Sequence, residues 1–242
     1  MDKTKSTEIK DAATIVIVRE QSKKYKILMG QRGKHAVFMP NKFVFPGGAY
    51  DPNDSMVPFS KPLPVKQKIL LSIDCSLTHP ESLAATVIRE LWEETGLKIA
   101  NSYDWKGSKI KGWEDFYANN IAPNVSKLKF FFRAITPVGR PRRFDARFFI
   151  CLAKDLNCDL DDFSNASDEL SHLQWIEIEK TKEFDLPIIT RIVLKEVQEL
   201  IFNGTNKKGV PFYSEGSSSK TVSYTHLRAH ETPEHLVCRL VD

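Results

Sequence analysis

The stretch HPESLAATVIRELWEETGL, residues 79–97, decides the fold of this chain and carries its chemistry. Apolar residues recur along it at helical spacing, which predicts a helix with one side packed on a core. The residues of that apolar stripe are Ala84, Ala85, Ile88, Leu91 and Trp92. Glu90, Glu93 and Glu94 follow the spacing i, i+3 and i+4, so three carboxylates share another side of the helix. Because like charges at this spacing repel, a bound cation or an arginine is expected to neutralise them.

Both ends of this helix are marked. Thr78 and Glu81 have the spacing of a capping box, Pro80 suits a first turn, and Gly96 suits the position just past the last turn. Taken alone, a glutamate pair on such a helix is best explained by a solvated acidic surface.

A longer motif disfavours that explanation. Residues 89–97, RELWEETGL, match in order the arginine, glutamate, apolar, any, glutamate, glutamate, any, glycine and apolar positions of the Nudix box. Glu81 stands at the upstream glutamate of the same box. The chain therefore resembles the Nudix hydrolase superfamily. It departs from the usual box at the glycine, because the natural candidate, Gly48 of FPGG, is separated from Glu81 by residues 49–80. An insertion thus splits the box.

The resemblance implies an α/β fold of the α+β kind, an α/β/α sandwich with a mixed central sheet, and the order of the predicted elements agrees with it. Strands are predicted at residues 12–19, 25–31, 43–45, 127–136, 147–153 and 173–178, and further helices at residues 65–72, 113–119 and 187–202. Pro46, Gly47 and Gly48 are predicted to form a turn, in which glycine permits a positive φ or a close backbone approach.

The domain organisation follows from the same pattern. We expect a flexible N-terminus at residues 1–11, a Nudix domain at residues 12–205 and a tail at residues 206–242. The insertion at residues 49–79 is either a lid beside the active centre or a disordered spacer. Residues 222–240, VSYTHLRAHETPEHLVCRL, resemble a translated sequencing adapter. Residues 222–242 are therefore expected to be artefactual, and their histidines receive no functional role.

Composition narrows the class of protein. No stretch of the 242 residues is long and apolar enough to span a bilayer, and the first residues lack a secretory leader, so we expect a soluble intracellular protein. It would be cytoplasmic, or peroxisomal or in another organelle. The four cysteines lack metal-site spacing and are expected to be thiols. A net charge of +4 suits a small anionic substrate and indicates neither a nucleic-acid nor a membrane partner. The pattern indicates no particular oligomeric state.

By the resemblance, the acidic side of the helix at residues 79–97 binds Mg²⁺ or Mn²⁺. Glu90 and Glu94 correspond to the principal metal ligands, Glu93 completes the shell, and the carbonyl group of Gly47 joins it. Arg89 is expected to orient the carboxylates. Such ions bridge phosphate oxygens and lower the pKa of bound water, which suits hydrolysis of a phosphoanhydride.

The roles of three other acidic residues stay open at this level. Helix capping explains Glu81 without any metal. The general base is either a glutamate of the box or a carboxylate of the downstream loop, where Glu169 and its neighbour Asp168 are the candidates. A solvated acidic loop is the alternative for these two.

Basic residues are the candidates for substrate binding. Arg32 opens a basic and aromatic loop. Arg140, Arg142 and Arg143 lie in a connection between two predicted strands. That connection is either a phosphate clamp, since guanidinium groups fit phosphate oxygens, or a solvated hairpin tip.

A narrower resemblance concerns the substrate. The segments HAVFMPNKFVFPGG (35–48) and TPVGRPRRFDARFFIC (136–151), together with the long insertion, resemble the Nudix branch of the peroxisomal coenzyme A diphosphatases and their bacterial relatives. That branch implies cleavage of the diphosphate in coenzyme A or acyl-CoA, whose 3′-phosphate would suit the three arginines. ADP-ribose, NADH and nucleotide sugars are the alternatives within the same reaction. A Nudix nucleotide-binding module without activity is the alternative from another class.

Overall fold

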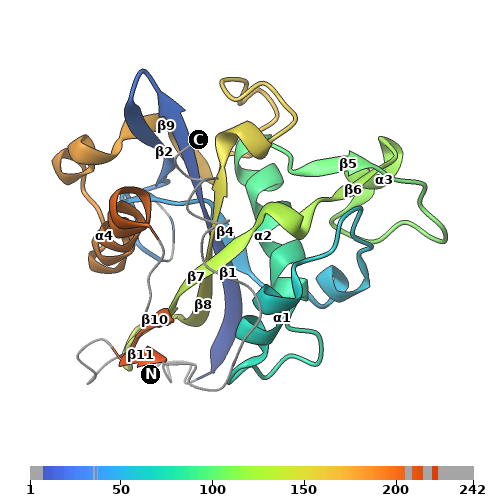
Figure 1. Ribbon diagram of the computed structural model, residues 1–242, viewed down its shortest axis with the longest axis horizontal. Helices are drawn as coiled ribbons and strands as arrows, with labels where there is room; N and C mark the ends of the chain where they lie inside the picture. The colour runs from blue at the N-terminus through green and yellow to red at the C-terminus, as the bar shows by residue number, and fades with distance from the viewer. Residues whose placement is uncertain (1–7, 35, 37, 205–208, 215–219, 223–242) are drawn as a thin grey trace.

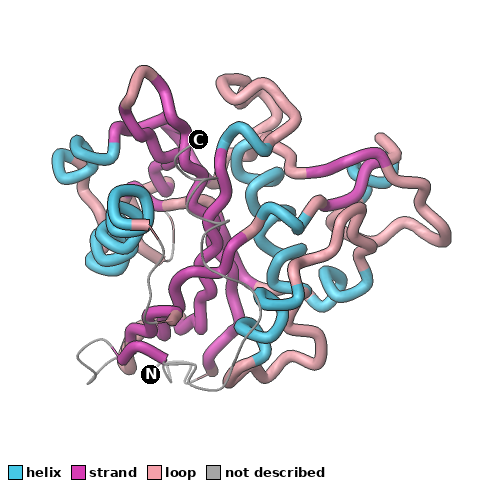
Figure 2. The backbone as a smooth tube through the Cα atoms, in the orientation of Figure 1, coloured by secondary structure: helices cyan, strands magenta, loops and turns pink. Residues whose placement is uncertain are grey.

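The computed structural model describes residues 8–34, 36, 38–204, 209–214 and 220–222. Its centre is one large mixed sheet (Figures 1 and 2). The strands lie in the order β11 (Lys220–Val222), β10 (Val210–Tyr213), β7 (Lys129–Ile135), β8 (Arg143–Leu152), β1 (Ile9–Gln21), β2 (Lys24–Arg32) and β3 (Phe43–Val44). In addition, β4 (Gly47–Ala49) pairs with β1 and β9 (Leu170–Glu177) pairs with β2. A separate small sheet consists of β5 (Ala100–Ser102) and β6 (Ile121–Pro123).

Helices cover both faces of the large sheet. They are α1 (Val65–Ser72), α2 (Ser82–Thr95), α3 (Glu114–Ala118) and α4 (Ile188–Asn203), with short 3-10 turns η1 (Pro52–Met56), η2 (Val125–Lys127), η3 (Ala153–Asp155) and η4 (Ile178–Glu183). Figure 1 shows α1 and α2 on one face and α4 on the other. No helix in the described ranges is long and apolar enough to span a bilayer.

The central strand β1 serves both cores, because successive residues of a strand point to opposite faces. Ile15 and Ile17 pack in the core that includes α2, whereas Val16 and Val18 pack in the core that includes α4. All four are almost fully buried, and each such side chain contributes about 1.5–3 kcal/mol relative to an exposed one. The predicted α/β/α sandwich with a mixed sheet is therefore confirmed.

Strands β1, β2 and β8 are longer than predicted, whereas β7 is shorter. β1 pairs in parallel with β8, starting from Ile9 opposite Arg143. Residues 9–11, which the sequence assigned to the flexible N-terminus, therefore belong to the sheet. β1 continues into β2 through Ser22 and Lys23, which both have positive φ, as a two-residue hairpin turn requires. The predicted hairpin is thus present.

Helix α2 ends as predicted but begins differently. Gly96 adopts the left-handed conformation, with φ of 77°, and its N–H donates to the Trp92 carbonyl oxygen at 2.8 Å. The N-cap is Glu81, which is itself helical in φ and ψ and makes no side-chain cap. The predicted capping box is therefore wrong. Ser82 Oγ instead donates back to the His79 carbonyl oxygen at 2.6 Å.

Gly47 and Gly48 lie in a strand and not in the predicted turn. In β4, Gly47 pairs with Thr14 and Gly48 with Ala13 of β1. A Cβ on Gly47 would lie 2.5 Å from the carbonyl oxygen of Ala13. The sheet therefore requires glycine here for close backbone approach, which the sequence indicated, although it placed the residues in a turn.

The insertion is folded onto the rest of the domain. Its helix α1 has the predicted bounds. Gln67 Oε1 accepts a hydrogen bond from the Phe130 backbone N–H of β7 at 2.8 Å. Ser60 Oγ donates to the Ala122 carbonyl oxygen at 2.9 Å, and Arg133 Nη2 donates to the Asp74 carbonyl oxygen at 2.9 Å. These bonds attach the insertion at both ends and in the middle.

The sheet also extends past residue 205, the predicted end of the domain. β10 lies parallel to β7, and β11 lies antiparallel to β10, with Val222 opposite Val210. Residues 223–242, which contain most of the segment that resembles an adapter, lie outside the described residues. Of the cysteines, Cys75, Cys151 and Cys158 are described, and they are free thiols as predicted.

Candidate functional site

Arg89 is the centre of the candidate site. Its Nη1 donates to Glu90 Oε1 at 2.8 Å and to Glu93 Oε2 at 3.1 Å. Its Nη2 donates to the Ala49 carbonyl oxygen at 3.0 Å. The guanidinium therefore links the glutamates of α2 to the end of β4.

The remaining donors of Arg89 go to Asp54, a residue of the insertion. Nε lies 3.0 Å from Asp54 Oδ1 and Nη2 lies 3.1 Å from Asp54 Oδ2. With these bonds all five N–H groups of Arg89 are used. Asp54 also accepts from Thr86 Oγ1 at 2.8 Å and from Trp113 Nε1 at 3.0 Å. The sequence motif gave no sign of this aspartate, because it lies outside the box.

The glycines of β4 shape the space around two of the glutamates. The Gly47 N–H donates to Glu94 Oε2 at 2.7 Å. A Cβ on Gly48 would stand 2.5 Å from both carboxylate oxygens of Glu90. Glycine at position 48 is therefore what allows the Glu90 carboxylate to rest against the strand.

Burial and mutual repulsion raise the pKa of all three glutamates. Loss of hydration raises the pKa of Glu90 to about 7, with repulsion by Glu93 and Glu169 adding to it and Arg89 opposing it. The pKa of Glu94 is well above its usual value for the same leading reason, and repulsion by Glu90 adds to it. Burial also raises the pKa of Glu93. Arg89 therefore neutralises only part of the negative charge on this side of the helix.

Glu169 and Arg32 meet at this cluster. Arg32 Nη2 lies 2.9 Å from Glu169 Oε1. Glu169 is about half exposed and raises the pKa of Glu90, Glu93 and Glu94 by repulsion. Arg32 lowers the pKa of Glu94. Two residues separated by 137 positions are therefore brought to one site.

The donor set suits a divalent cation. With Asp54, five carboxyl groups interact with one another here, against the two guanidinium groups of Arg89 and Arg32. Carboxylate oxygens are hard ligands of the kind that Mg²⁺ and Mn²⁺ prefer. Within the described residues, no three acidic, histidine or cysteine side chains converge into a ready-made metal cage. Arg89 and the Gly47 N–H hold the carboxylate oxygens instead.

The other predicted residues lie further away. Arg140 and Arg142 are exposed, and Arg143 begins β8 with its Nε donating to the Thr136 carbonyl oxygen at 3.1 Å. On β8, Arg143 lies four residues before Arg147, which stands level with Gly48 across β1. At ~3.3 Å per residue, the three arginines begin ~13 Å from the level of the glutamates. Glu81 lies 4.0 Å from Lys68 and is not bonded to the glutamate cluster.

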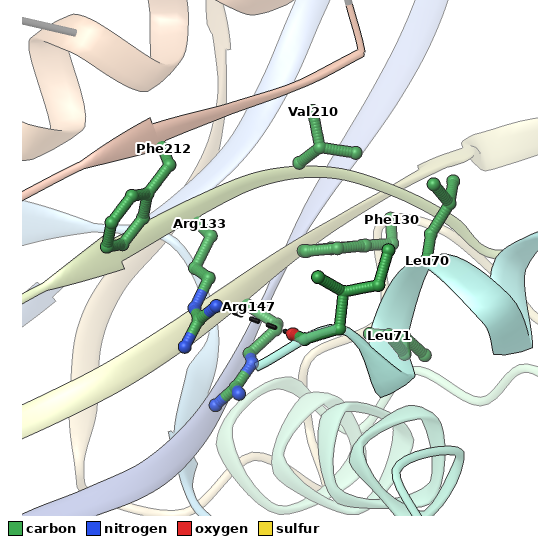
Figure 3. A pocket seen from close by; sticks show the side chains of 8 residues that line it. Leu70, Leu71, Phe130, Arg133, Arg147, Val210 and Phe212 are labelled. Atoms are coloured by element: carbon green, nitrogen blue, oxygen red, sulfur yellow. Dashed lines mark hydrogen bonds between the residues drawn. The ribbon is translucent and has the colours of Figure 1, made fainter. Parts of the chain in front are cut away.

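Two cavities lie near the insertion. Figure 3 shows Arg133 and Arg147 next to each other in the first, beside the end of α1. Its volume of about 10 Å³ has room for about one water molecule, so it excludes a nucleotide. The second, of about 170 Å³, lies beside Asp54 and the start of α2 and is lined on the insertion side by Val57 and Phe59. Insertion residues thus form part of a hollow next to the start of α2.

Comparison with known proteins finds relatives both among curated sequences and among solved structures. No family model matches the chain. A Caenorhabditis elegans protein named "Putative nudix hydrolase 7" is 27% identical over 182 residues, which cover 69% of this chain and 51% of that protein. The chain thus spans about half the length of the curated relative that it matches. The crystal structure of a NUDIX hydrolase from Alicyclobacillus acidocaldarius superposes with a TM-score of 0.59 at 26% identity, covering 78% of this chain and 90% of that chain.

Proposed function

We propose that this chain, as a member of the Nudix hydrolase superfamily, catalyses metal-dependent hydrolysis of the diphosphate bond in a nucleoside diphosphate derivative. The observation that carries the proposal is the cluster around Arg89. There Glu90, Glu93 and Glu94 share a partly buried site with Glu169, and their pKa values are raised by burial and repulsion. Such a cluster is costly for stability, and it has a chemical purpose if it binds a cation.

In this proposal Glu90, Glu94 and Glu93 hold Mg²⁺ or Mn²⁺ together with the carbonyl group of Gly47. When bound, the ion supplies charge neutralisation at the phosphate oxygens and a lowered pKa for a water molecule. Arg89 holds the carboxylates of Glu90 and Glu93 in place through its Nη1. The protein thus provides an ordered set of oxygens before any ligand arrives.

The proton of the attacking water goes to a carboxylate at the site. Glu169 is the proposed base on the loop side, because it is about half exposed and held by Arg32 at 2.9 Å. A glutamate of the box is the alternative. A carboxylate base contributes ~10²–10⁴-fold in rate, so Glu169→Gln is expected to lower turnover by that factor while Mn²⁺ still binds. Unchanged turnover in this variant would assign the base to the box.

The proposed substrate is coenzyme A or acyl-CoA. The arginines of residues 140–143 begin ~13 Å along β8 from the level of the glutamates, which is too far for contact with the scissile diphosphate. They suit a second, remote phosphate on the same molecule, such as the 3′-phosphate of coenzyme A. Arg32, in contrast, lies at the glutamate cluster and suits the diphosphate itself. ADP-ribose, NADH and nucleotide sugars have the scissile bond without that 3′-phosphate.

A hydrolysis panel on the full chain tests the proposal. Coenzyme A, acyl-CoA, ADP-ribose and NADH are compared with Mg²⁺, with Mn²⁺ and with EDTA, and Glu90→Gln serves as the inactive control. The proposal requires metal-dependent turnover with coenzyme A or acyl-CoA as the best substrate. Preference for ADP-ribose or NADH would refute the substrate and leave the reaction in place. Nucleotide binding without any metal-dependent turnover would instead identify a binding module.

A further inference from the structure

We propose that Asp54, supplied by the insertion, is a positioning residue for the metal-binding glutamates and acts on them through Arg89. This inference rests on the proposed function, because it assigns the insertion a role in the same site. In the usual Nudix box no insertion separates the glycine from the helix. In this chain the insertion supplies the carboxylate that orients the arginine of the box.

Asp54 is a buried carboxylate. Its side chain is fully buried, with 0% of its surface exposed. An isolated carboxylate in such a place would be strongly destabilising, so its partners must account for it. Both oxygens are used: Oδ1 accepts from Arg89 and Trp113, and Oδ2 accepts from Arg89, Thr86 and the Asp51 N–H. The carboxylate is therefore held by α2, by the segment before α3 and by Asp51, the residue that precedes η1.

Asp54 determines how the Arg89 guanidinium is oriented. Asp54 takes Nε and one N–H of Nη2 in a two-point contact, which fixes the plane of the guanidinium. Only Nη1 is then directed at Glu90 and Glu93. Without Asp54, the attraction of the glutamates would draw the whole guanidinium toward them. Arg89 would then act as an internal cation and compete with the metal ion for the same oxygens.

The segment that supplies Asp54 is attached to the rest of the domain by hydrogen bonds. Asp51 and Asp54 form a capping box at the start of η1. Further along, the insertion is bonded to the sheet through Gln67 and through Arg133, which also contacts the Ile73 carbonyl oxygen (Figure 3). A segment attached in this way supplies the carboxylate at a fixed position. The insertion thus contributes to metal affinity, besides any effect on substrate choice.

The test measures Mn²⁺ affinity by electron paramagnetic resonance, which does not depend on turnover. Asp54→Asn keeps the shape of the side chain and removes its charge. It is expected to weaken Mn²⁺ binding by ~10–100-fold, the usual effect of losing a residue that orients metal ligands. Thr86→Val is the matched control, because it removes one donor to Asp54 and leaves both bonds to Arg89. It is expected to lower the melting temperature and to leave Mn²⁺ affinity within ~2-fold of the wild type.

Equal Mn²⁺ affinity in Asp54→Asn and the wild type would overturn the inference and leave the proposed function intact. The same holds if Thr86→Val loses as much affinity as Asp54→Asn, because the effect would then follow stability alone. Failure of the wild-type chain to bind Mn²⁺ would instead contradict the proposed function itself.

A second measurement uses the wild-type chain and so does not require Asp54→Asn to fold. The indole N–H resonance of Trp113, assigned with Trp113→Phe, is followed by NMR during a Mg²⁺ titration. Because this N–H donates to Asp54, it should shift when the ion binds and Arg89 adjusts. The indole N–H groups of Trp105 and Trp175 donate to backbone carbonyl oxygens of Ile121 and Leu160 and serve as internal references. A Trp113 shift no larger than theirs would overturn the inference.

Discussion

Replacing Glu90 with glutamine should stabilise the metal-free protein at high pH. Burial and repulsion raise the pKa of Glu90 from 4.5 to about 7. In the folded state it therefore keeps a proton that the unfolded chain has already released between these pH values. Because the native state binds more protons there, the free energy of unfolding falls as pH rises through this window.

The size of the effect follows from the shift. A difference of roughly 2.5 pKa units at ~1.4 kcal/mol per unit corresponds to about 3 kcal/mol that the charged side chain costs the fold above pH 7. Glutamine resembles the neutral acid and avoids this cost. At pH 8 with EDTA, Glu90→Gln should therefore melt ~6–12 °C above the wild type, since 1 kcal/mol corresponds to ~2–4 °C for a domain of this size. Near pH 4.5 the two should melt together.

Differential scanning calorimetry from pH 4.5 to 8 measures the difference directly. Saturating Mg²⁺ should reverse it, because the ion stabilises the wild type and has lost a ligand in the variant. Glu81→Gln is the matched control at the N-cap of the same helix, since Glu81 lies outside the cluster and its loss should change stability by less than ~0.5 kcal/mol. A Glu90→Gln variant that is less stable than the wild type at pH 8 in EDTA would refute the electrostatic reasoning.

Three further changes have defined outcomes. Gly48→Ala would place a methyl group 2.5 Å from the oxygens of the nearest glutamate, so Mn²⁺ affinity should fall ~10-fold or more and stability by ~1–3 kcal/mol, measured by titration and by thermal melting. Gly33→Ala is its control, because nothing lies within 4 Å of a Cβ there and the protein should be unaffected. Replacing both Arg140 and Arg142 with alanine should raise KM for coenzyme A ~10-fold or more. The KM for the same molecule without its 3′-phosphate should stay unchanged. Equal changes in KM for the two molecules would show that these arginines do not bind the 3′-phosphate. Deleting residues 223–242, a cut placed after Val222 because it pairs with Val210, should alter the melting temperature and turnover by no more than experimental error, and a large loss of either would show that the tail is part of the protein.

Much of the fold was readable from local patterns. The bounds of α1, the left-handed exit of α2 at Gly96 and the hairpin of β1 and β2 each depend on residues close together in the chain. The errors have a common cause. Ile9 extends β1, and Gly47 and Gly48 form a strand, because each pairs with a residue far along the chain. Strand ends depend on such partners, which no local pattern contains.

The candidate site divides in the same way. The motif placed Arg89, Glu90, Glu93 and Glu94 on one helix, and the structure has them there. It could not indicate Asp54, because an aspartate in a segment of turn-forming residues is ordinary until its burial is known.

The sequence by itself therefore determined the class of fold and the three glutamates on one helix, because a helix places residues i, i+3 and i+4 together without help from the rest of the chain. Only the tertiary structure decided how those charges are accommodated. Gly48 makes room for Glu90, Arg32 brings Glu169 to the cluster, and Asp54 fixes Arg89. The physical reason is that burial and charge pairing depend on distances between segments that only folding brings together.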